Sequence, residues 1–344
     1  MLSVEKLKEI RVELENSQNP LFLFDNDVDG LCSFLILRRS IDRGRGVAIK
    51  SFPDLKEQYL KKVDELNPDL VVILDKAEVS EEFIVGCGEK NLPIIWIDHH
   101  ETKTSKDLID KTSYYNSFPS SEPTTYIAQK VFNRKEDIWL AMIGCINDVY
   151  MPEFAKEFAK DFPELFNANL SAFDALHNTE IGKIALMLNF GLMDSTTNVV
   201  NLIKYLFKAR DSYDILEENR YNRNLHEKFS ELKKFYNTQI EKAGEKLDKS
   251  SPLLFFSYSG STSMSSQIAN KLCYLHKDKL IVVAYKRPEK VNISIRGKNA
   301  LEITKKITKK IKNSTGGGHK EATGAMVPID QFDNFKKLII DIAS

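Results

Sequence analysis

The stretch "LFLFDNDVDG" at residues 21–30 decides the fold expected for the N-terminal part of the chain. It joins four apolar residues, typical of a buried strand, to a glycine through three aspartates spaced two apart, Asp25, Asp27 and Asp29. In open parallel sheets, ligands bind beyond the carboxyl ends of the strands, where loops lead into helices. The stretch therefore predicts a strand that delivers carboxylates to the functional edge of a parallel sheet.

The same alternation of strand and helix patterns continues to about residue 150. Apolar, β-rich runs occupy residues 21–24, 46–52, 70–74 and 93–97, and helical spacing occupies residues 30–42, 54–66, 79–90, 123–133 and 137–147. Repeated units of this kind predict a parallel sheet that is covered on both faces.

Two further parts follow. Residues 152–247 show apolar residues at helical spacing with hardly a strand-like run, and strand patterns return from residue 253. Strands are predicted at 253–259, 280–286 and 291–297, and helices at 263–275, 299–312 and 330–343. The fold class is therefore α/β, with an N-terminal parallel-sheet domain over 1–150, a helical connector over 151–250 and a smaller C-terminal α/β domain over 251–344.

Composition limits the class of protein. The 344 residues are 42% hydrophobic and 28% charged, which is the balance of a soluble globular protein, and the net charge is zero. The charged first 20 residues do not look like a signal peptide, and no run of 18 apolar residues occurs, so we expect a cytoplasmic protein without a membrane partner. The four cysteines are far apart and form no CxxC pair, which argues against disulfides and thiolate zinc sites.

Acidic and imidazole residues recur where the predicted strands end. Besides the three aspartates after the first strand, these are Asp75, then Asp98, His99 and His100, and Asp148 at the end of a helical segment. Such carboxylates repel one another unless cations lie between them. Carboxylate and imidazole ligands without thiolates favour two Mn²⁺ ions per chain over Zn²⁺, with Mg²⁺ as the alternative. Two ions about 3.5–4 Å apart are the usual arrangement for hydrolysis of phosphate esters.

Each of these elements also has a structural explanation. A single aspartate after a strand is most often a turn or helix N-cap residue, and adjacent histidines are often surface residues. The agreement of three strand ends, rather than any one motif, favours the metal site.

At this point the sequence resembles a known family. "DNDVDG" (25–30), Asp75, "DHH" (98–100) and Asp148 resemble motifs I to IV of the DHH phosphoesterase superfamily, and "GGGHKEATGAM" (316–326) resembles the signature of its DHHA1 substrate-binding domain. The resemblance implies that Asp27, Asp29, Asp75, His99 and Asp148 bind metal, with Asp75 bridging two ions. It implies that Asp98 orients its neighbours, and that His100 faces the substrate phosphate or protonates the leaving group.

Two positions depart from the family pattern. Many members place a histidine four residues before the second aspartate of motif I, and this chain has Leu23 there. Asp25 is the substitute ligand that the "DxDxDG" form of RecJ-like nucleases suggests. Lys76 follows Asp75 where a small residue is more usual, and its cation either contacts a substrate phosphate or disfavours metal.

The C-terminal signature is expected to bind the substrate. Glycines Gly316, Gly317 and Gly318 let backbone N–H groups approach an anion as in a phosphate-binding loop, His319 adds a donor, and Arg296 ends a strand of the same domain. The alternative is a plain flexible loop. Residues 286–312 carry ten Lys or Arg against two Glu, so this region is cationic and suited to a nucleic-acid backbone.

The resemblance implies a hydrolase that acts on single-stranded DNA or RNA, and the long connector favours an archaeal RecJ-like exonuclease with a role in DNA replication or repair. The alternatives are a nanoRNase or a phosphodiesterase for cyclic dinucleotides or pAp, and a metal-impaired scaffold of a replication or repair complex. A helicase or replisome component is the partner suggested by analogy. The sequence leaves open DNA or RNA preference, polarity, minimum substrate length and oligomeric state, including a homodimer or larger assembly.

Overall fold

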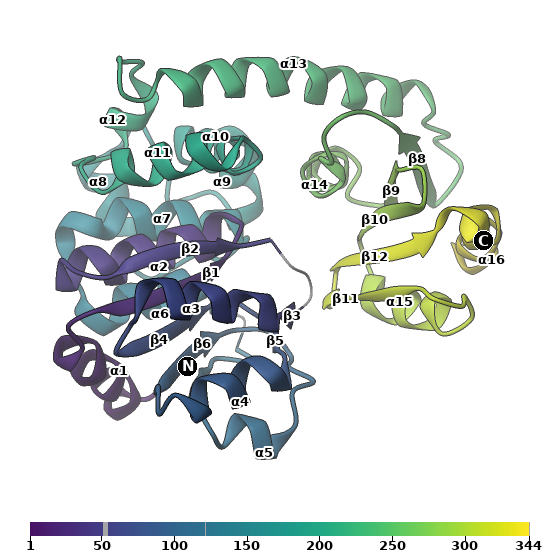
Figure 1. The fold of residues 1–344 in the computed structure, drawn as a ribbon. Coiled ribbons are helices and arrows are strands. Elements are labelled where there is room, and N and C mark those ends of the chain that lie inside the picture. Colours follow the sequence, from purple (N-terminus) through teal and green to yellow (C-terminus); the bar gives the residue numbers. More distant parts are fainter. Residues whose placement is uncertain (51–53, 121, 344) are drawn as a thin grey trace. The chain divides into compact units, whose positions relative to one another are not determined.

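The computed structural model describes residues 1–50, 54–120 and 122–343 and divides the chain into two compact units, residues 1–228 and 229–344 (Figure 1). Each unit contains one five-stranded sheet. The division into three parts, 1–150, 151–250 and 251–344, stays a prediction. Within the described residues, none of the helices combines the length and apolar character that crossing a bilayer needs.

The sheet of the first unit is entirely parallel, with strand order β2-β1-β4-β6-β7. Its strands are β1 (Pro20–Asp25), β2 (Arg45–Ile49), β4 (Leu70–Leu74), β6 (Ile94–Asp98) and β7 (Ser113–Asn116), and β3 (Asp54–Leu55) pairs with β5 (Glu78–Val79) beside it. The parallel sheet confirms the α/β prediction. Residues 51 and 52 of the predicted strand 46–52 lie outside the described residues.

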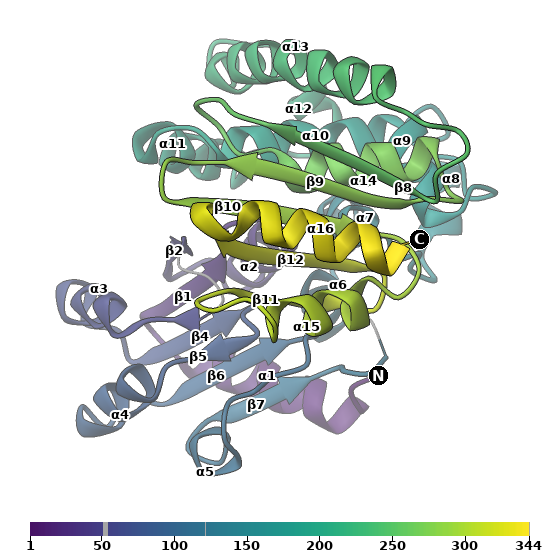
Figure 2. The ribbon, with the colours of Figure 1, turned by 90° about the vertical axis from the view of Figure 1, so that its right-hand side faces the viewer.

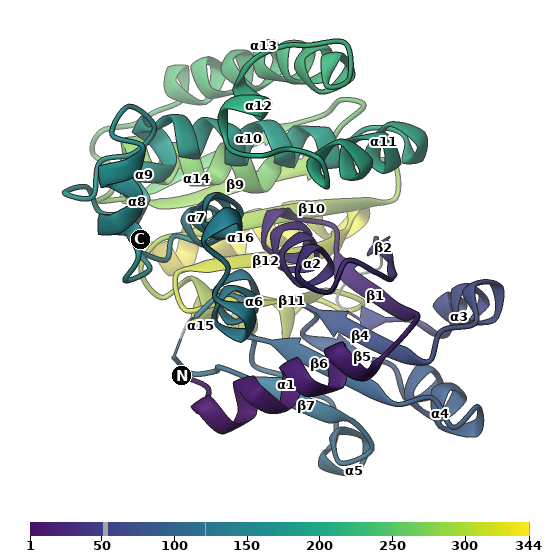
Figure 3. The ribbon, with the colours of Figure 1, turned by 90° about the vertical axis from the view of Figure 1, so that its left-hand side faces the viewer.

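Helices cover both faces of this sheet, as Figure 3 shows with α2 and α6 on one side and α3 and α4 on the other. The helices are α1 (Val4–Asn16), α2 (Val28–Ile41), α3 (Leu60–Leu66), α4 (Glu81–Glu89), α5 (Lys106–Ile109), α6 (Thr124–Phe132) and α7 (Ile138–Asn147), with 3₁₀ turns η1 (Glu57–Tyr59) and η2 (Lys135–Asp137). The predicted helix 54–66 is wrong at its start, because Asp54 and Leu55 form β3 and pair with β5, and the helical residues are those of η1 and α3.

Side chains of β1 alternate between the two faces. Leu21 and Leu23 are buried in a cluster with Trp96 and with residues of α3 and α4, whereas the ring of Phe24 stacks on Phe34 of α2 at 4.7 Å between centroids. A strand that is buried on both faces reads as a continuous apolar run, as "LFLF" does. The strand is therefore fixed between two helix layers, and its end is fixed with it.

Most of the helical segment after residue 150 packs within the first unit. It contains α8 (Ala155–Asp161), α9 (Ala172–Asn178), α10 (Glu180–Leu192), α11 (Thr196–Leu206) and α12 (Tyr213–Leu216), and α13 (Arg223–Glu245) runs from the first unit into the second. Helix α10 packs against α7 and also contacts α2. The segment is thus part of the structure around the end of α7.

The sheet of the second unit is mixed, with strand order β11-β12-β10-β9-β8, and only β8 and β9 are parallel. Its elements are β8 (Leu253–Tyr258), α14 (Ser265–Leu275), β9 (Leu280–Lys286), β10 (Lys290–Arg296), α15 (Ala300–Thr308), β11 (Thr315–His319), β12 (Ala322–Pro328), the 3₁₀ turn η3 (Ile329–Gln331) and α16 (Phe332–Ala343). Figure 2 shows α15 and α16 across the near face of this sheet and α14 behind it. A separate, smaller α/β unit agrees with the predicted fold class.

The glycine-rich stretch of the second unit is a strand, so the predicted loop is wrong at this position. Thr315–His319 form β11 at the edge of the sheet, where Gly317 pairs with Gly324 of β12. Gly318 has a φ of +131°, a conformation that side chains rarely adopt. The sequence suggested a loop because glycine is depleted in strands.

Candidate metal centre

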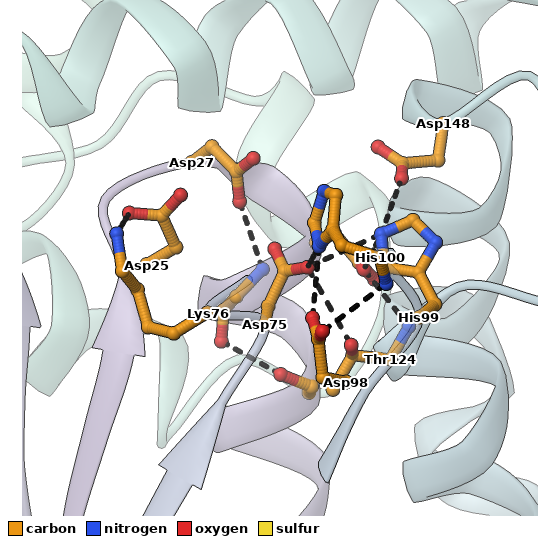
Figure 4. A network of polar contacts seen from close by, with 12 residues as sticks. Asp25, Asp27, Asp75, Lys76, Asp98, His99, His100, Thr124 and Asp148 are labelled. Carbon is orange, nitrogen blue, oxygen red and sulfur yellow. Dashed lines mark hydrogen bonds and ion pairs between the residues drawn. The ribbon is translucent and has the colours of Figure 1, made fainter. Parts of the chain in front are cut away.

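The carboxyl edge of the first sheet gathers the acidic and imidazole side chains predicted from the sequence (Figure 4). Asp25 ends β1, Asp27 caps α2, Asp29 lies in the first turn of α2, Asp75 follows β4, Asp98 ends β6 and is followed by His99 and His100, and Asp148 follows α7. The elements that supply these side chains are far apart in the sequence, and they meet because parallel strands end at one edge.

Asp75 lies at the centre of the group and has an unusual backbone. Its φ is +60°, in the left-handed region that non-glycine residues seldom occupy, and its N–H donates to the Ile97 carbonyl oxygen at 3.0 Å. Its Oδ1 lies 3.2 Å from His99 Nε2 and 3.8 Å from His100 Nδ1. Backbone strain of this kind persists where the surroundings impose it, and it clusters at functional sites.

The side chains form overlapping groups whose ligand atoms lie within 4.8 Å of one another. One group contains Asp29, His99 and Asp148, in which His99 Nε2 lies 3.7 Å from Asp29 Oδ2 and 3.4 Å from Asp148 Oδ2. A second group contains Asp25, Asp27 and Asp75. We call these two the imidazole group and the carboxylate group. The edge therefore offers two adjacent groups of side chains that could each hold a cation.

Another set of possible ligands consists of Asp75, Asp98 and His100. It shares Asp75 with the carboxylate group, and Asp75 also lies beside His99 of the imidazole group. Asp98 Oδ1 contacts His100 Nδ1 at 2.8 Å, and its Oδ2 accepts the His100 backbone N–H at 3.1 Å. Asn116 of β7 donates from Nδ2 to the His100 carbonyl oxygen at 2.9 Å. Asp98 thus contacts both the ring and the backbone of His100, and its orienting role stays a prediction.

Asp29 is oriented by the start of α6, which the sequence did not reveal. Its two carboxylate oxygens accept the backbone N–H groups of Thr125 at 2.7 Å and Thr124 at 2.9 Å. The Thr125 hydroxyl also donates to the Asp29 carbonyl oxygen at 2.9 Å. A carboxylate has about four lone-pair positions, so these bonds leave capacity for a cation. Nothing in "EPTT" signals this contact.

Asp148 is oriented by α10. Asn147 donates from Nδ2 to Asp148 Oδ1 at 3.2 Å, and Asn189 of α10 donates from Nδ2 to Asn147 Oδ1 at 2.8 Å. Outer contacts of this kind fix the direction in which a ligand points. Asn147 could be suspected from its position beside Asp148, whereas Asn189 carries no signal in the sequence.

Lys76 is buried beside the carboxylate group. Its side chain is 1% exposed and extends from the end of β4 back to Asp25, whose Oδ1 lies 3.2 Å from Nζ (Figure 4). The Lys76 carbonyl oxygen accepts the Trp96 indole N–H at 2.8 Å. Leu23, at the position where many family members have a histidine, is fully buried in the apolar cluster with Trp96. Leu23 therefore offers no ligand atom at the carboxyl edge of the sheet.

The concentration of charge changes the pKa values of these groups. Burial and the neighbouring Asp25 and Asp148 raise the pKa of Asp27 to about 8, and burial with Asp148 raises that of Asp29 to about 6. Burial and the nearby aspartates raise the pKa of Asp75 well above its ordinary value. Without cations, the carboxylates hold protons that their usual pKa values would release.

The two histidines shift in opposite directions. Burial and the adjacent His100 lower the pKa of His99 to about 4, so its ring is neutral, as a metal ligand must be. Burial opposes the charged form of His100, but the Asp98 carboxylate outweighs it and raises the pKa of His100 to about 9. A neutral imidazole among crowded carboxylates is a donor set that fits divalent cations such as Mn²⁺ or Mg²⁺.

The predicted substrate-binding residues all lie in the second unit. Gly316, Gly317, Gly318 and His319 belong to the edge strand β11. Arg296 ends β10, the third strand in the sheet, and its guanidinium donates to Asn270 Oδ1 at 2.5 Å, to Ser266 Oγ at 2.7 Å and to the Thr323 carbonyl oxygen at 3.0 Å. Burial lowers the pKa of Arg296 to about 10. Much of its hydrogen-bonding capacity is used within this unit.

Two family models match the sequence. The model for the DHH family, N-terminal domain, matches residues 21–150, and the model for the DHHA1 domain matches residues 252–344. Together they span more than half of the chain and contain every predicted site residue. No curated protein matches the sequence.

Solved structures share the fold at low identity. RecJ from Thermus thermophilus in complex with Mn²⁺ is 15% identical with a TM-score of 0.69, and the match covers 99% of this chain and 55% of that one. Exonuclease RecJ bound to manganese is 16% identical with a TM-score of 0.65, covering 99% and 95%. A DHH domain from a member of a family of ribosomal proteins is 15% identical with a TM-score of 0.71, covering 97% and 89%.

Proposed function

We infer the function of this chain from its family, since it belongs to the DHH phosphoesterase superfamily and carries a DHHA1 domain. We propose that it is a metal-dependent phosphodiesterase. The observation that carries this proposal is the pair of adjacent groups of possible metal ligands, the imidazole group and the carboxylate group, at one edge of the sheet. Paired positions of this kind suit hydrolysis of a phosphate ester.

Divalent ions held by the two groups would act as Lewis acids and lower the pKa of a bound water. The chain's own residues would hold these ions and orient the groups that contact the substrate. Asp75, which approaches both histidines, joins the two groups. Asp98 fixes the His100 ring through Nδ1, so that this side chain faces the substrate phosphate or gives a proton to the leaving oxygen.

The finer proposal is a manganese-dependent exonuclease for single-stranded nucleic acid. Lys305, Lys306, Lys309 and Lys310 are exposed on and just after α15, while Ile307 and Ile311 are buried beneath them. Such a cationic surface binds several phosphates without reading the sequence. The fold shared with RecJ also supports an exonuclease. The chain spans 55% of the length of the Thermus thermophilus protein.

In this proposal the second unit holds the end of the strand. The glycines of β11 let a phosphate approach the backbone at the sheet edge, and His319 and Arg296 supply donors. A helicase or replisome component stays the predicted protein partner, and the oligomeric state stays open.

A manganese titration tests the activity. A labelled single strand of about 20 nucleotides, longer than most single-strand binding sites, is incubated with increasing Mn²⁺ or Mg²⁺, alongside dinucleotides and cyclic dinucleotides. Stepwise shortening of the long strand supports the exonuclease. Cleavage restricted to oligomers of a few residues would assign the nanoRNase alternative instead.

The scaffold alternative predicts a different outcome. If none of these substrates is cut at any metal concentration while the protein stays folded, the phosphodiesterase proposal is wrong. Asp75→Asn serves as the matched control, because it keeps the shape of the side chain and removes its charge. Cleavage by this variant at the rate of the wild type would assign the activity to a contaminant.

A further inference from the structure

A buried lysine at the sheet edge makes the two cation positions unequal. The Lys76 ammonium lies 3.2 Å from Asp25 Oδ1 and only 1% of its side chain is exposed. A buried charge is costly unless an opposite charge lies beside it. Asp25, which is 26% exposed, supplies that charge, so at least one carboxylate of the carboxylate group is already compensated by the protein itself.

The backbone around Lys76 keeps the ammonium in this place. Asp75 adopts the left-handed conformation just before it, and the Trp96 indole binds the Lys76 carbonyl oxygen from the next strand. Trp96 is fully buried. The direction of the lysine side chain therefore follows from the fixed end of β4, rather than from a mobile surface loop.

The two groups also differ in their ligands. The imidazole group combines two carboxylates with the neutral His99, whose Nε2 approaches both Asp29 and Asp148. The carboxylate group, within the residues that the structure describes, contains three aspartates and no imidazole. An ammonium beside a cation position repels a divalent ion, and it does so strongly where water is excluded.

We propose that Lys76 is a built-in counter-ion of the carboxylate group, so that the imidazole group binds a divalent ion first and the carboxylate group binds a second ion at least about tenfold more weakly. This inference rests on the proposed function and deepens it, because it assigns an order of metal binding to the two positions. The second ion is then recruited when the anionic phosphate of a substrate offsets the repulsion from Lys76.

Mn²⁺ binding to the full-length chain tests the inference without any cleavage assay. Calorimetry gives the number of ions and their dissociation constants, and electron paramagnetic resonance separates an isolated Mn²⁺ ion from a spin-coupled pair. The wild type is expected to bind one tight ion with the spectrum of an isolated ion. Lys76→Met, which keeps the buried aliphatic stem, is expected to bind two ions with comparable affinity and to show a coupled pair.

Lys103→Met is the matched control. It removes the same charge from the same unit, but the Lys103 side chain is 71% exposed and pairs with Glu78 at 3.5 Å rather than with an aspartate of the carboxylate group. It should bind Mn²⁺ as the wild type does. His99→Ala should lose the tight ion, because it removes the imidazole that defines the imidazole group.

The outcomes separate the two proposals. Two equally tight ions in the wild type would overturn the counter-ion role, and this measurement holds even if Lys76→Met fails to fold. A folded Lys76→Met variant that still binds one ion would overturn it as well. If the wild type binds no Mn²⁺ at all, the metal-dependent function itself is wrong.

Discussion

Replacing Gly30 by alanine is expected to disturb the metal centre far more than one methyl group suggests. A Cβ at Gly30 would lie 2.4 Å from the carbonyl oxygen and 2.8 Å from the nitrogen of Asp25, and separations under 3.0 Å essentially never occur. Because both atoms are backbone, the start of α2 must move from the end of β1 by about half an ångström or more. Overpacking of this kind costs about 1–3 kcal/mol of the free energy of unfolding.

The same movement separates Asp25 from Asp27 and Asp29, which come shortly before the substituted residue at the start of α2. Since a misplacement of about 1 Å can reduce catalysis about 100-fold, we expect kcat/KM to fall about 10- to 100-fold, together with Mn²⁺ affinity. Urea unfolding, calorimetric Mn²⁺ binding and cleavage of a labelled single strand measure the three effects.

Gly88→Ala is the matched control for this prediction. Gly88 lies in α4, and a Cβ there meets nothing within 4 Å. Alanine should therefore raise the free energy of unfolding by about 0.5–1 kcal/mol and leave Mn²⁺ binding unchanged. If Gly30→Ala keeps both the stability and the Mn²⁺ affinity of the wild type, the close approach of α2 to β1 is not what positions the aspartates.

Three further predictions use other contacts. Asp75→Ala should abolish kcat while Arg296→Ala mainly raises KM, and equal losses of kcat in single-strand cleavage would contradict this division of roles. Asn189→Leu should weaken Mn²⁺ binding about 10-fold, with the circular dichroism spectrum unchanged, because Asp148 loses its support from α10; an unaltered dissociation constant would argue against it. Arg39→Met removes the 2.6 Å partner of the fully buried Asp137, which keeps Arg134 at 3.1 Å, and should lower the free energy of unfolding by about 2 kcal/mol; a urea-measured loss under about 1 kcal/mol would refute the burial argument.

The parallel sheet and the place where its acidic residues gather could be predicted from the sequence for a physical reason. Each strand that is buried on both faces is a short run of apolar residues, and its carboxyl end is marked by the first polar residue that follows. "LFLF" before Asp25 and "LVVIL" before Asp75 are of this kind. Since all such ends meet at one edge, local patterns were enough to bring distant residues together.

The parts that could not be predicted depend on contacts without a local pattern. β11 consists largely of glycine, and it is a strand because β12 pairs with it. β7, "SYYN", is short and only partly buried. The burial of Lys76 depends on where its side chain turns after Asp75, and the sequence permits both a lysine that faces solvent and one that faces Asp25.

The contacts behind the ligands change how the helical segment after residue 150 is understood. The sheet edge supplies the charges, but the start of α6 binds the Asp29 carboxylate, β7 binds the His100 backbone carbonyl through Asn116, and α10 supports Asp148 through Asn147. Each of these contacts comes from an element that lies later in the chain than the residue it binds. We therefore expect the candidate metal centre to form only when the first unit folds as a whole. We therefore expect the long helical segment to orient Asp148, a proposed metal ligand, in addition to any role in joining two domains.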